Sequence, residues 1–126
     1  MSATLGWQDW LAPTPIHEVE GHYYKREDYF APYGYGGING SKLRQLVYLV
    51  AKAKEENVSQ LFTAASVRSP QISMTSVVGA EFGLPVTVLM GATNPESSLK
   101  YPNVRIGALA GAIFRYTKVG YNPVLQ

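Results

Sequence analysis

The sequence predicts an α/β fold, a three-layer αβα arrangement in which a parallel sheet is covered by helices. Helical and strand patterns alternate over residues 41–117, and the connections between them are short. This alternation is typical of parallel sheets, because a crossover helix must return the chain to the same edge before each new strand. The length of 126 residues fits one domain, and an apolar fraction of 46% is sufficient for a buried core.

The first of these elements is an amphipathic helix over residues 41–56. Its apolar side chains recur at the spacing i, i+3, i+4 and i+7, which places them on one helix face. Asn39 or Ser41 is expected to cap its start, and Asn57 to follow its end. The later elements, in order, are a strand over 60–65, a helix over 70–82, a strand over 85–90, a helix over 103–110 and a strand over 113–117.

Residues 1–40 are expected to form an N-terminal extension that ends in a glycine-rich loop, since prolines and glycines interrupt the periodic patterns there. A short strand is expected at His22–Lys25, where aromatic residues suit a pleated surface. Residues 41–126 then form the small α/β domain. The last residues, 121–126, resemble the opening of a helix that the chain does not complete, so we expect this domain to be truncated at its C-terminal end.

The composition excludes several classes of function. No cysteine is present, which removes disulfides, thiol catalysis and cysteine-ligated metals, and His17 and His22 lack metal-binding spacing, so we expect no metal. The net charge of +2 gives no direct signal for nucleic-acid binding. Residues 64–126 do carry five basic and only two acidic side chains, a bias compatible with an anionic ligand. Without a signal peptide or a membrane-spanning apolar segment, the chain is expected to be cytoplasmic and not membrane-bound.

The first candidate site is the glycine-rich stretch 36–42, which runs into the first helix. Backbone N–H groups at such a junction can bind phosphate. Its spacing matches neither a Walker A loop nor the G-x-G-x-x-G dinucleotide motif. Lys42 is either an ordinary exposed lysine at a helix start or a nucleophilic amine. The helix dipole, and burial against Leu46 and Leu49, would favour the neutral amine that a nucleophile requires.

The second candidate site is the segment 63–71, at the carboxyl end of a predicted parallel strand and the start of the next helix. Open α/β sheets bind ligands at this edge, where free N–H groups favour a carboxylate or a phosphate. Ser66, Ser69 and Gln71 add side-chain donors to the segment. Ordinary capping of the helix is the alternative explanation for Ser69.

Four segments occur in the order found in one enzyme family: Thr14–Ile16, Tyr24–Asp28, Ser41–Leu46 and Thr63–Gln71. Together they resemble the N-terminal portion of a fold-type II pyridoxal 5′-phosphate enzyme of the tryptophan synthase β superfamily, in its aminocyclopropane-carboxylate deaminase and D-cysteine desulfhydrase branch. The resemblance implies that Lys42 binds the cofactor covalently as a Schiff base and acts as the general base. It also implies that the phosphate-binding cup belongs to a larger domain outside this chain.

The chain departs from the pattern of that branch at three positions. Pro70 stands where the branch has the asparagine that holds the ring hydroxyl of the cofactor, and Gln71 replaces a histidine. We expect Gln71 to supply the missing hydrogen bond to the cofactor. Ser41 stands where the branch usually has asparagine. By the same resemblance, Ser69 lies beside the substrate as a catalytic residue, and Ser66, Ser69 and Gln71 bind the substrate carboxylate.

The resemblance implies a pyridoxal-phosphate-dependent lyase of the deaminase or desulfhydrase kind, which acts on an amino acid. One alternative is a β-replacement synthase or a phage-type modification enzyme whose substrate is an amino-acid adduct. Another is a truncated, non-catalytic α/β domain. We expect the full-length enzyme to be a homodimer, and this chain alone to be incomplete and inactive.

Overall fold

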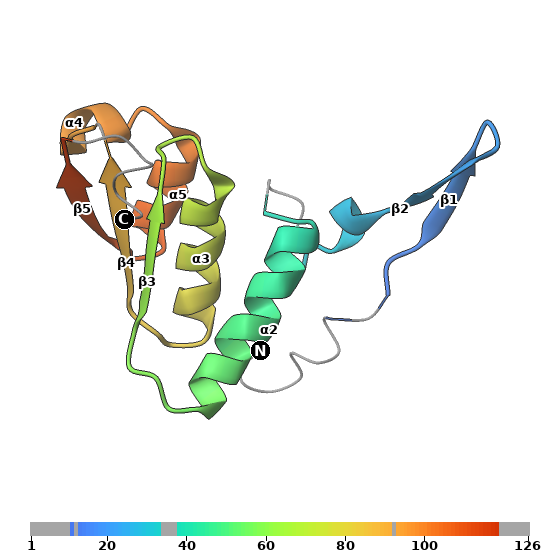
Figure 1. Ribbon diagram of the computed structural model, residues 1–126, viewed down its shortest axis with the longest axis horizontal. Helices are drawn as coiled ribbons and strands as arrows, with labels where there is room; N and C mark the ends of the chain where they lie inside the picture. The colour runs from blue at the N-terminus through green and yellow to red at the C-terminus, as the bar shows by residue number, and fades with distance from the viewer. Residues whose placement is uncertain (1–10, 12, 34–37, 92, 119–126) are drawn as a thin grey trace.

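The computed structural model describes residues 11, 13–33, 38–91 and 93–118 (Figure 1). The helix opening expected at 121–126 lies outside these residues. No helix in the described ranges is long and apolar enough to cross a membrane. In chain order the elements are β1 (Ile16–Val19), β2 (His22–Lys25), the 3₁₀ helix η1 (Glu27–Tyr29), α2 (Ser41–Glu55), β3 (Leu61–Ala65), α3 (Pro70–Glu81), β4 (Val86–Gly91), α4 (Pro95–Ser98), α5 (Pro102–Leu109) and β5 (Ile113–Thr117).

Strands β3, β4 and β5 form a parallel sheet in that order. Leu61 of β3 lies opposite Val86 of β4, and Thr87 of β4 lies opposite Ile113 of β5. Helix α3 connects β3 to β4, and α4 with α5 connects β4 to β5. The predicted α/β class, with a parallel sheet flanked by helices, is therefore confirmed. Since the strands are parallel, their carboxyl ends meet at one edge of the sheet.

One apolar cluster lies between the sheet and the helices α3 and α5. Val86, Val88 and Met90 alternate along β4 and are all buried, as expected for one face of a strand. They pack with Ile72 of α3 and Val104 of α5. A second cluster joins α3 to α2, which lies on the side of α3 away from the sheet in Figure 1. Helix α3 is therefore the element that both clusters share.

The opposite face of the sheet is open among the described residues. Phe62 of β3 is 66% exposed, and Ile113 of β5 is 46% exposed. Leu89 of β4 alternates with the buried positions of that strand and is only partly covered. The packing of the described helices thus protects one side of the sheet much better than the other.

Strands β1 and β2 form an antiparallel hairpin that projects away from the sheet and its helices (Figure 1). The strand predicted at His22–Lys25 is confirmed, whereas its partner β1 was not predicted. Glu20 and Gly21 both have positive φ angles, 51° and 81°, as in a type I′ hairpin turn. All but one of the strand residues are exposed, so the hairpin contributes little to the apolar clusters.

Helix α2 begins after a glycine rather than after a capping side chain. Its N-cap is Gly40, with φ 96°, a conformation that glycine adopts without steric penalty. The expected capping by Asn39 or Ser41 is wrong, because the first lies one position too early and the second is already helical. At the other end Asn57 has φ 61°, the left-handed conformation typical of a residue that follows a helix, as predicted.

Candidate active site

The two segments singled out from the sequence lie at the same end of the structure. Helix α2 runs in one direction, and β3 returns in the other (Figure 1). The first turn of α2, which carries Lys42, is therefore at the end where β3 finishes and residues 66–69 begin. This end is also the carboxyl edge of the parallel sheet, where open α/β folds bind ligands.

Lys42 is exposed at this end of α2. The burial against Leu46 and Leu49 that we expected is not found, since Leu46 is only partly buried and Leu49 is 60% exposed. The reason is the orientation of the helix: Leu43 and Val47 point into the apolar cluster with α3 and are fully buried. Lys42 and Leu49 belong to the outward stripe, so the amine is accessible to a ligand.

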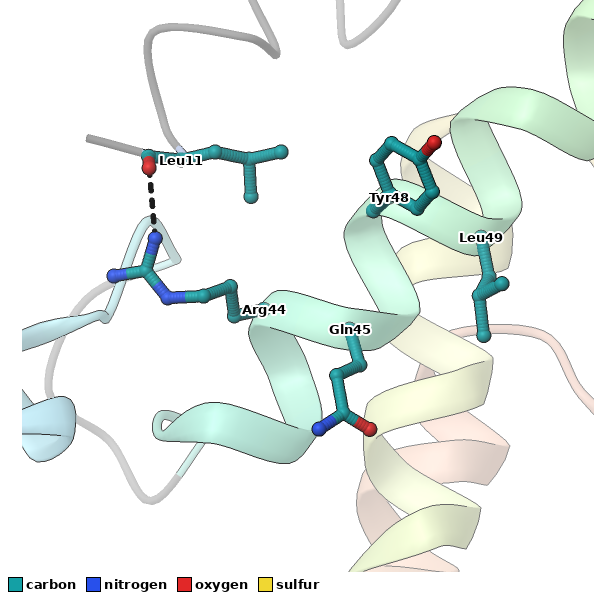
Figure 2. Close-up of a pocket in the computed structure, with 5 residues that line it drawn as sticks. All are labelled: Leu11, Arg44, Gln45, Tyr48 and Leu49. Carbon is teal, nitrogen blue, oxygen red and sulfur yellow. Dashed lines mark hydrogen bonds between the residues drawn. The ribbon is translucent and has the colours of Figure 1, made fainter. Parts of the chain in front are cut away.

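A groove of about 500 Å³ runs along the outward side of α2. Gln45 and Leu49 follow Lys42 at the spacing i+3 and i+7, so the three side chains share one stripe of the helix. Figure 2 shows the guanidinium of Arg44 reaching the carbonyl of Leu11 across the groove. The groove is lined by Leu11, Arg44, Gln45, Tyr48 and Leu49.

An ionic cluster fixes the first turns of α2 to the hairpin segment. The Nε of Arg44 donates to Glu27 at 3.0 Å, and its Nη1 donates to the carbonyl of Leu11 at 2.8 Å. The same guanidinium lies 4.4 Å from the ring centre of Phe30, which is buried. A cation in the first turn of a helix is disfavoured by the helix dipole, and the Glu27 carboxylate offsets that cost. Sequence reasoning missed this cluster.

Glu27 is the centre of the cluster. Its carboxylate accepts hydrogen bonds from Lys25 and from the hydroxyl of Thr14, the latter at 2.6 Å, in addition to that from Arg44. These bonds, that from Lys25 foremost, lower the pKa of Glu27 to about 2. The carboxylate is therefore ionised at neutral pH, and it holds the segment before α2 against the helix that presents Lys42.

The loop after β3 is ordered as a helix cap. Ser69 is the N-cap of α3, and its hydroxyl accepts a hydrogen bond from the N–H of Gln71 at 3.2 Å. Pro70 occupies the first helical position, where a missing N–H costs nothing. Ser66 is exposed, and its carbonyl accepts from the N–H of Ser69 at 3.0 Å. The capping alternative for Ser69 thus holds in this structure, and Ser66 stays available to a ligand.

Gln71 lies against Thr63, the middle residue of β3. Its side-chain Nε2 donates to the hydroxyl of Thr63 at 2.5 Å, and the side chain is half-buried. This bond directs the amide nitrogen toward the strand, so the amide oxygen is the atom left to accept a further bond. Thr63 and Gln71 belong to the same candidate segment of the sequence, but the sequence did not indicate the hydrogen bond between their side chains.

Asn103, at the start of α5, supports the loop from the other side. Its Nδ2 donates to the carbonyl of Arg68 at 3.4 Å, and its Oδ1 accepts from the buried hydroxyl of Ser73 at 2.7 Å. The guanidinium of Arg68 also lies 5.2 Å from the ring centre of Tyr101. These residues are about 30 positions apart in sequence, so no local pattern could have revealed the contact.

An accessible lysine at a helix start and a capped, serine-bearing loop thus lie at the carboxyl edge of a parallel sheet, the edge at which open α/β folds bind ligands. No three His, Asp or Glu side chains of the described residues gather as a metal site requires.

Comparison with known proteins gives the family. The chain is 36% identical over 97% of its length to the O-seryl-dTMP PLP-dependent decarboxylase of Salmonella phage ViI, and it spans 32% of that protein. It is 29% identical over 89% of its length to a 1-aminocyclopropane-1-carboxylate deaminase of Bradyrhizobium diazoefficiens, spanning 36% of it. It is 36% identical over 63% of its length to a D-cysteine desulfhydrase of Salmonella paratyphi A, spanning 25% of it. No protein-family model matches the chain.

These similarities confirm the predicted resemblance of the chain to part of the pyridoxal-phosphate-dependent enzymes of the fold-type II family. It spans about a third or less of the length of these curated relatives.

Proposed function

We propose that this chain is part of a pyridoxal-phosphate-dependent enzyme that acts at the α-carbon of an amino acid, and that Lys42 is the residue to which the cofactor is attached. The observation that carries the proposal is the accessible amine of Lys42 at the same end as the loop of residues 66–71. Bound pyridoxal phosphate supplies an electron sink that weakens the bonds to the α-carbon.

The donor set at this end fits such a cofactor. Lys42 takes part in none of the four ion pairs found among the described residues, so its amine is not committed to a carboxylate. Once displaced by the amine of the substrate, the Nζ of Lys42 can accept or return a proton as a general base. The amide oxygen of Gln71 is an acceptor for the ring hydroxyl, because its nitrogen already donates to Thr63.

The loop after β3 is the segment proposed to bind the carboxylate of the substrate. The hydroxyls of Ser66 and Ser69 are neutral donors, which suit a carboxylate in a pre-organised site. Asn103 acts through Arg68 and Ser73 to keep the loop in place. Asn103 is therefore a positioning residue in this scheme, whereas Ser66 and Ser69 contact the substrate.

Two candidates remain for the bond that breaks. The first is elimination or deamination of a free amino acid, in line with the deaminase and desulfhydrase relatives. The second is modification of an amino-acid adduct, with loss of its carboxylate. The match to the phage decarboxylase favours this second candidate, because it combines 36% identity with 97% coverage of the chain.

The experiment compares the full-length enzyme of which this chain is proposed to be a part, reconstituted with pyridoxal phosphate, with its Lys42→Ala and Lys52→Ala variants. Lys52 is an exposed lysine on the same helix, so its removal is the matched control. We expect Lys42→Ala to lose the absorbance of the covalently held cofactor and Lys52→Ala to keep it. Carbon dioxide released from an O-seryl thymidine nucleotide supports the second candidate, and ammonia or sulfide released from free amino acids supports the first. Retention of the absorbance by Lys42→Ala would overturn the proposal.

A further inference from the structure

The basic side chains of the two halves of the chain differ in how many form ion pairs. Before residue 60, Lys25, Arg26, Arg44 and Lys52 all form ion pairs with carboxylates. Among the described residues, no cation from Arg68 onward has a carboxylate within ion-pairing distance. The net charge of +2 therefore conceals a local excess of positive charge in the second half.

Four of these unpaired cations gather near the carboxyl edge of the sheet, and we call them the basic rim: Arg68, Lys100, Arg105 and Lys118. All four side chains are exposed. The sequence after Glu81 contains a single acid, Glu96, so the local charge is strongly positive.

Contacts of Arg68 and Arg105 place three members of the basic rim, Arg68, Lys100 and Arg105, at one corner of the structure. Arg68 follows β3 and stacks on Tyr101, which is the neighbour of Lys100. Arg105 donates to the carbonyl of Leu99 at 3.4 Å, at the same corner between α4 and α5. These contacts bring the loop after β3 and the chain after β4 together.

Lys118 joins the same edge from the last strand. It directly follows β5, two positions after Tyr116. The hydroxyl of Tyr116 lies 3.2 Å from that of Ser98 on α4, which packs β5 against the chain after β4. All three strand ends of the sheet therefore contribute to the basic rim.

A cavity of about 580 Å³ opens at the ends of β4 and β5. This volume is in the range of small-molecule sites. Its lining combines hydroxyls, an amide, an aromatic ring and an ammonium group, and consists of Thr93, Asn94, Tyr116, Thr117 and Lys118. These groups are polar donors with one cation, as a phosphate-bearing ligand requires.

We propose that the basic rim and this cavity bind the phosphate of a deoxynucleotide that carries the amino-acid group of the substrate. The inference rests on the second candidate of the proposed function, the amino-acid adduct. Arg68 belongs both to the basic rim and to the loop 66–69, so an amino-acid group held by that loop would have its nucleotide beside the rim. Unpaired cations on an exposed edge attract phosphates through release of bound counterions, an interaction that weakens with salt.

The test measures fluorescence anisotropy of a labelled single-stranded oligothymidylate with the full chain at several salt concentrations. The variants are Lys100→Ala/Lys118→Ala and, as the matched control, Lys52→Ala/Lys54→Ala, which removes two lysines near the opposite end of α2. We expect salt-dependent binding whose slope falls by one to two units in the rim variant and is unchanged in the control. Between 50 and 200 mM salt, that difference amounts to roughly a tenfold smaller loss of affinity.

Competition with unlabelled ligands identifies the source of the phosphate. Competition by dTMP but not by thymidine supports a mononucleotide, and competition by oligothymidylate alone supports a polynucleotide. Equal effects of the two double variants, binding without salt dependence, or equal competition by thymidine and dTMP would each overturn the inference. Displacement of the oligonucleotide by pyridoxal phosphate at equal concentration would also overturn it, since the rim would then hold the phosphate of the cofactor.

The binding assay uses no cofactor, so its result is separable from that for Lys42. A Lys42→Ala variant should bind the oligonucleotide as the unaltered protein does. If the protein holds the cofactor but does not bind the oligonucleotide, the inference about the basic rim is overturned and the proposed function is not.

Discussion

The segment 13–33 and the α/β unit of residues 61–118 are held in place by different forces. In the first, the strands are almost entirely exposed, and the contact with α2 combines the ionic cluster of Glu27 with the buried ring of Phe30 and the partly buried Tyr33. In the second, alternate residues of β4 are buried against helices α3 and α5. Apolar packing is insensitive to pH, whereas a carboxylate cluster responds to it.

This difference bears on the proposed site. Four of the six cations before residue 60 pair with a nearby acid, whereas the described cations of the basic rim pair with none. Lys42 lies at the junction, on a helix whose inner face joins the apolar cluster and whose first turns are held by Arg44 and Glu27. Substitutions in each region should therefore separate the contribution of apolar packing from that of the ionic cluster.

The largest effect is expected from Ile72→Ala in the α/β unit. Ile72 is fully buried between the sheet and α5, and removal of its side chain leaves a cavity. We expect the free energy of unfolding to fall by about 2–5 kcal/mol. Urea unfolding at pH 7 and at pH 4 should give the same loss. A loss that changed strongly with pH would contradict an apolar origin.

A smaller, pH-dependent effect is expected from Glu27→Gln. At neutral pH the variant should lose about 1–2 kcal/mol, because three donors lose their anionic partner. The pKa of Glu27 is about 2 in the folded protein against an ordinary value of 4.5. Because the pKa of Glu27 is lower in the folded protein than in the unfolded chain, its ionised carboxylate stabilises the folded state at pH values above 4.5. This stabilisation disappears as the pH falls toward 2.

Unfolding free energies of the unaltered protein and Glu27→Gln should therefore converge in acid. The control is Glu18→Gln, which neutralises an exposed carboxylate of the same hairpin. We expect that control to match the unaltered protein at each pH. A constant gap for Glu27→Gln from pH 7 to pH 2 would show that the cluster is not held by charge.

The smallest effect is expected from Ser69→Ala at the start of α3. Loss of the bond to the N–H of Gln71 should cost about 1 kcal/mol, the usual value of an N-cap. Ser66→Ala, which removes an exposed hydroxyl from the same loop, should leave the stability unchanged. Thermal unfolding of both variants measures the difference. Equal stabilities would show that Ser69 does not cap α3 in solution.

The sequence predicted the parts of the fold that local patterns encode. The sheet and its crossover helices followed from apolar periodicity, and Pro70 marked the start of α3. Strand β1 was missed because its turn uses Glu20 at positive φ, where asparagine or aspartate is the usual signal. Helix α4 was missed because its four residues are too few to show a period.

The site was predictable only in its local segments. Lys42 and the loop 66–71 are each continuous in sequence, and their common end follows from the alternation of helix and strand. The bond between Arg44 and Glu27 and that between Asn103 and Ser73 join residues 17 and 30 positions apart. The expected burial of Lys42 failed because periodicity identifies an apolar face without showing that a partner covers a neighbouring stripe.

Reduction of the holo-protein with borohydride, followed by peptide mass mapping, decides whether Lys42 holds the cofactor. Reduction makes the bond between a lysine and pyridoxal phosphate permanent, so the modified residue can be identified. We expect the added pyridoxyl mass on the peptide that contains Lys42. Modification of Lys25, Lys52 or Lys54, with Lys42 unmodified, would contradict it.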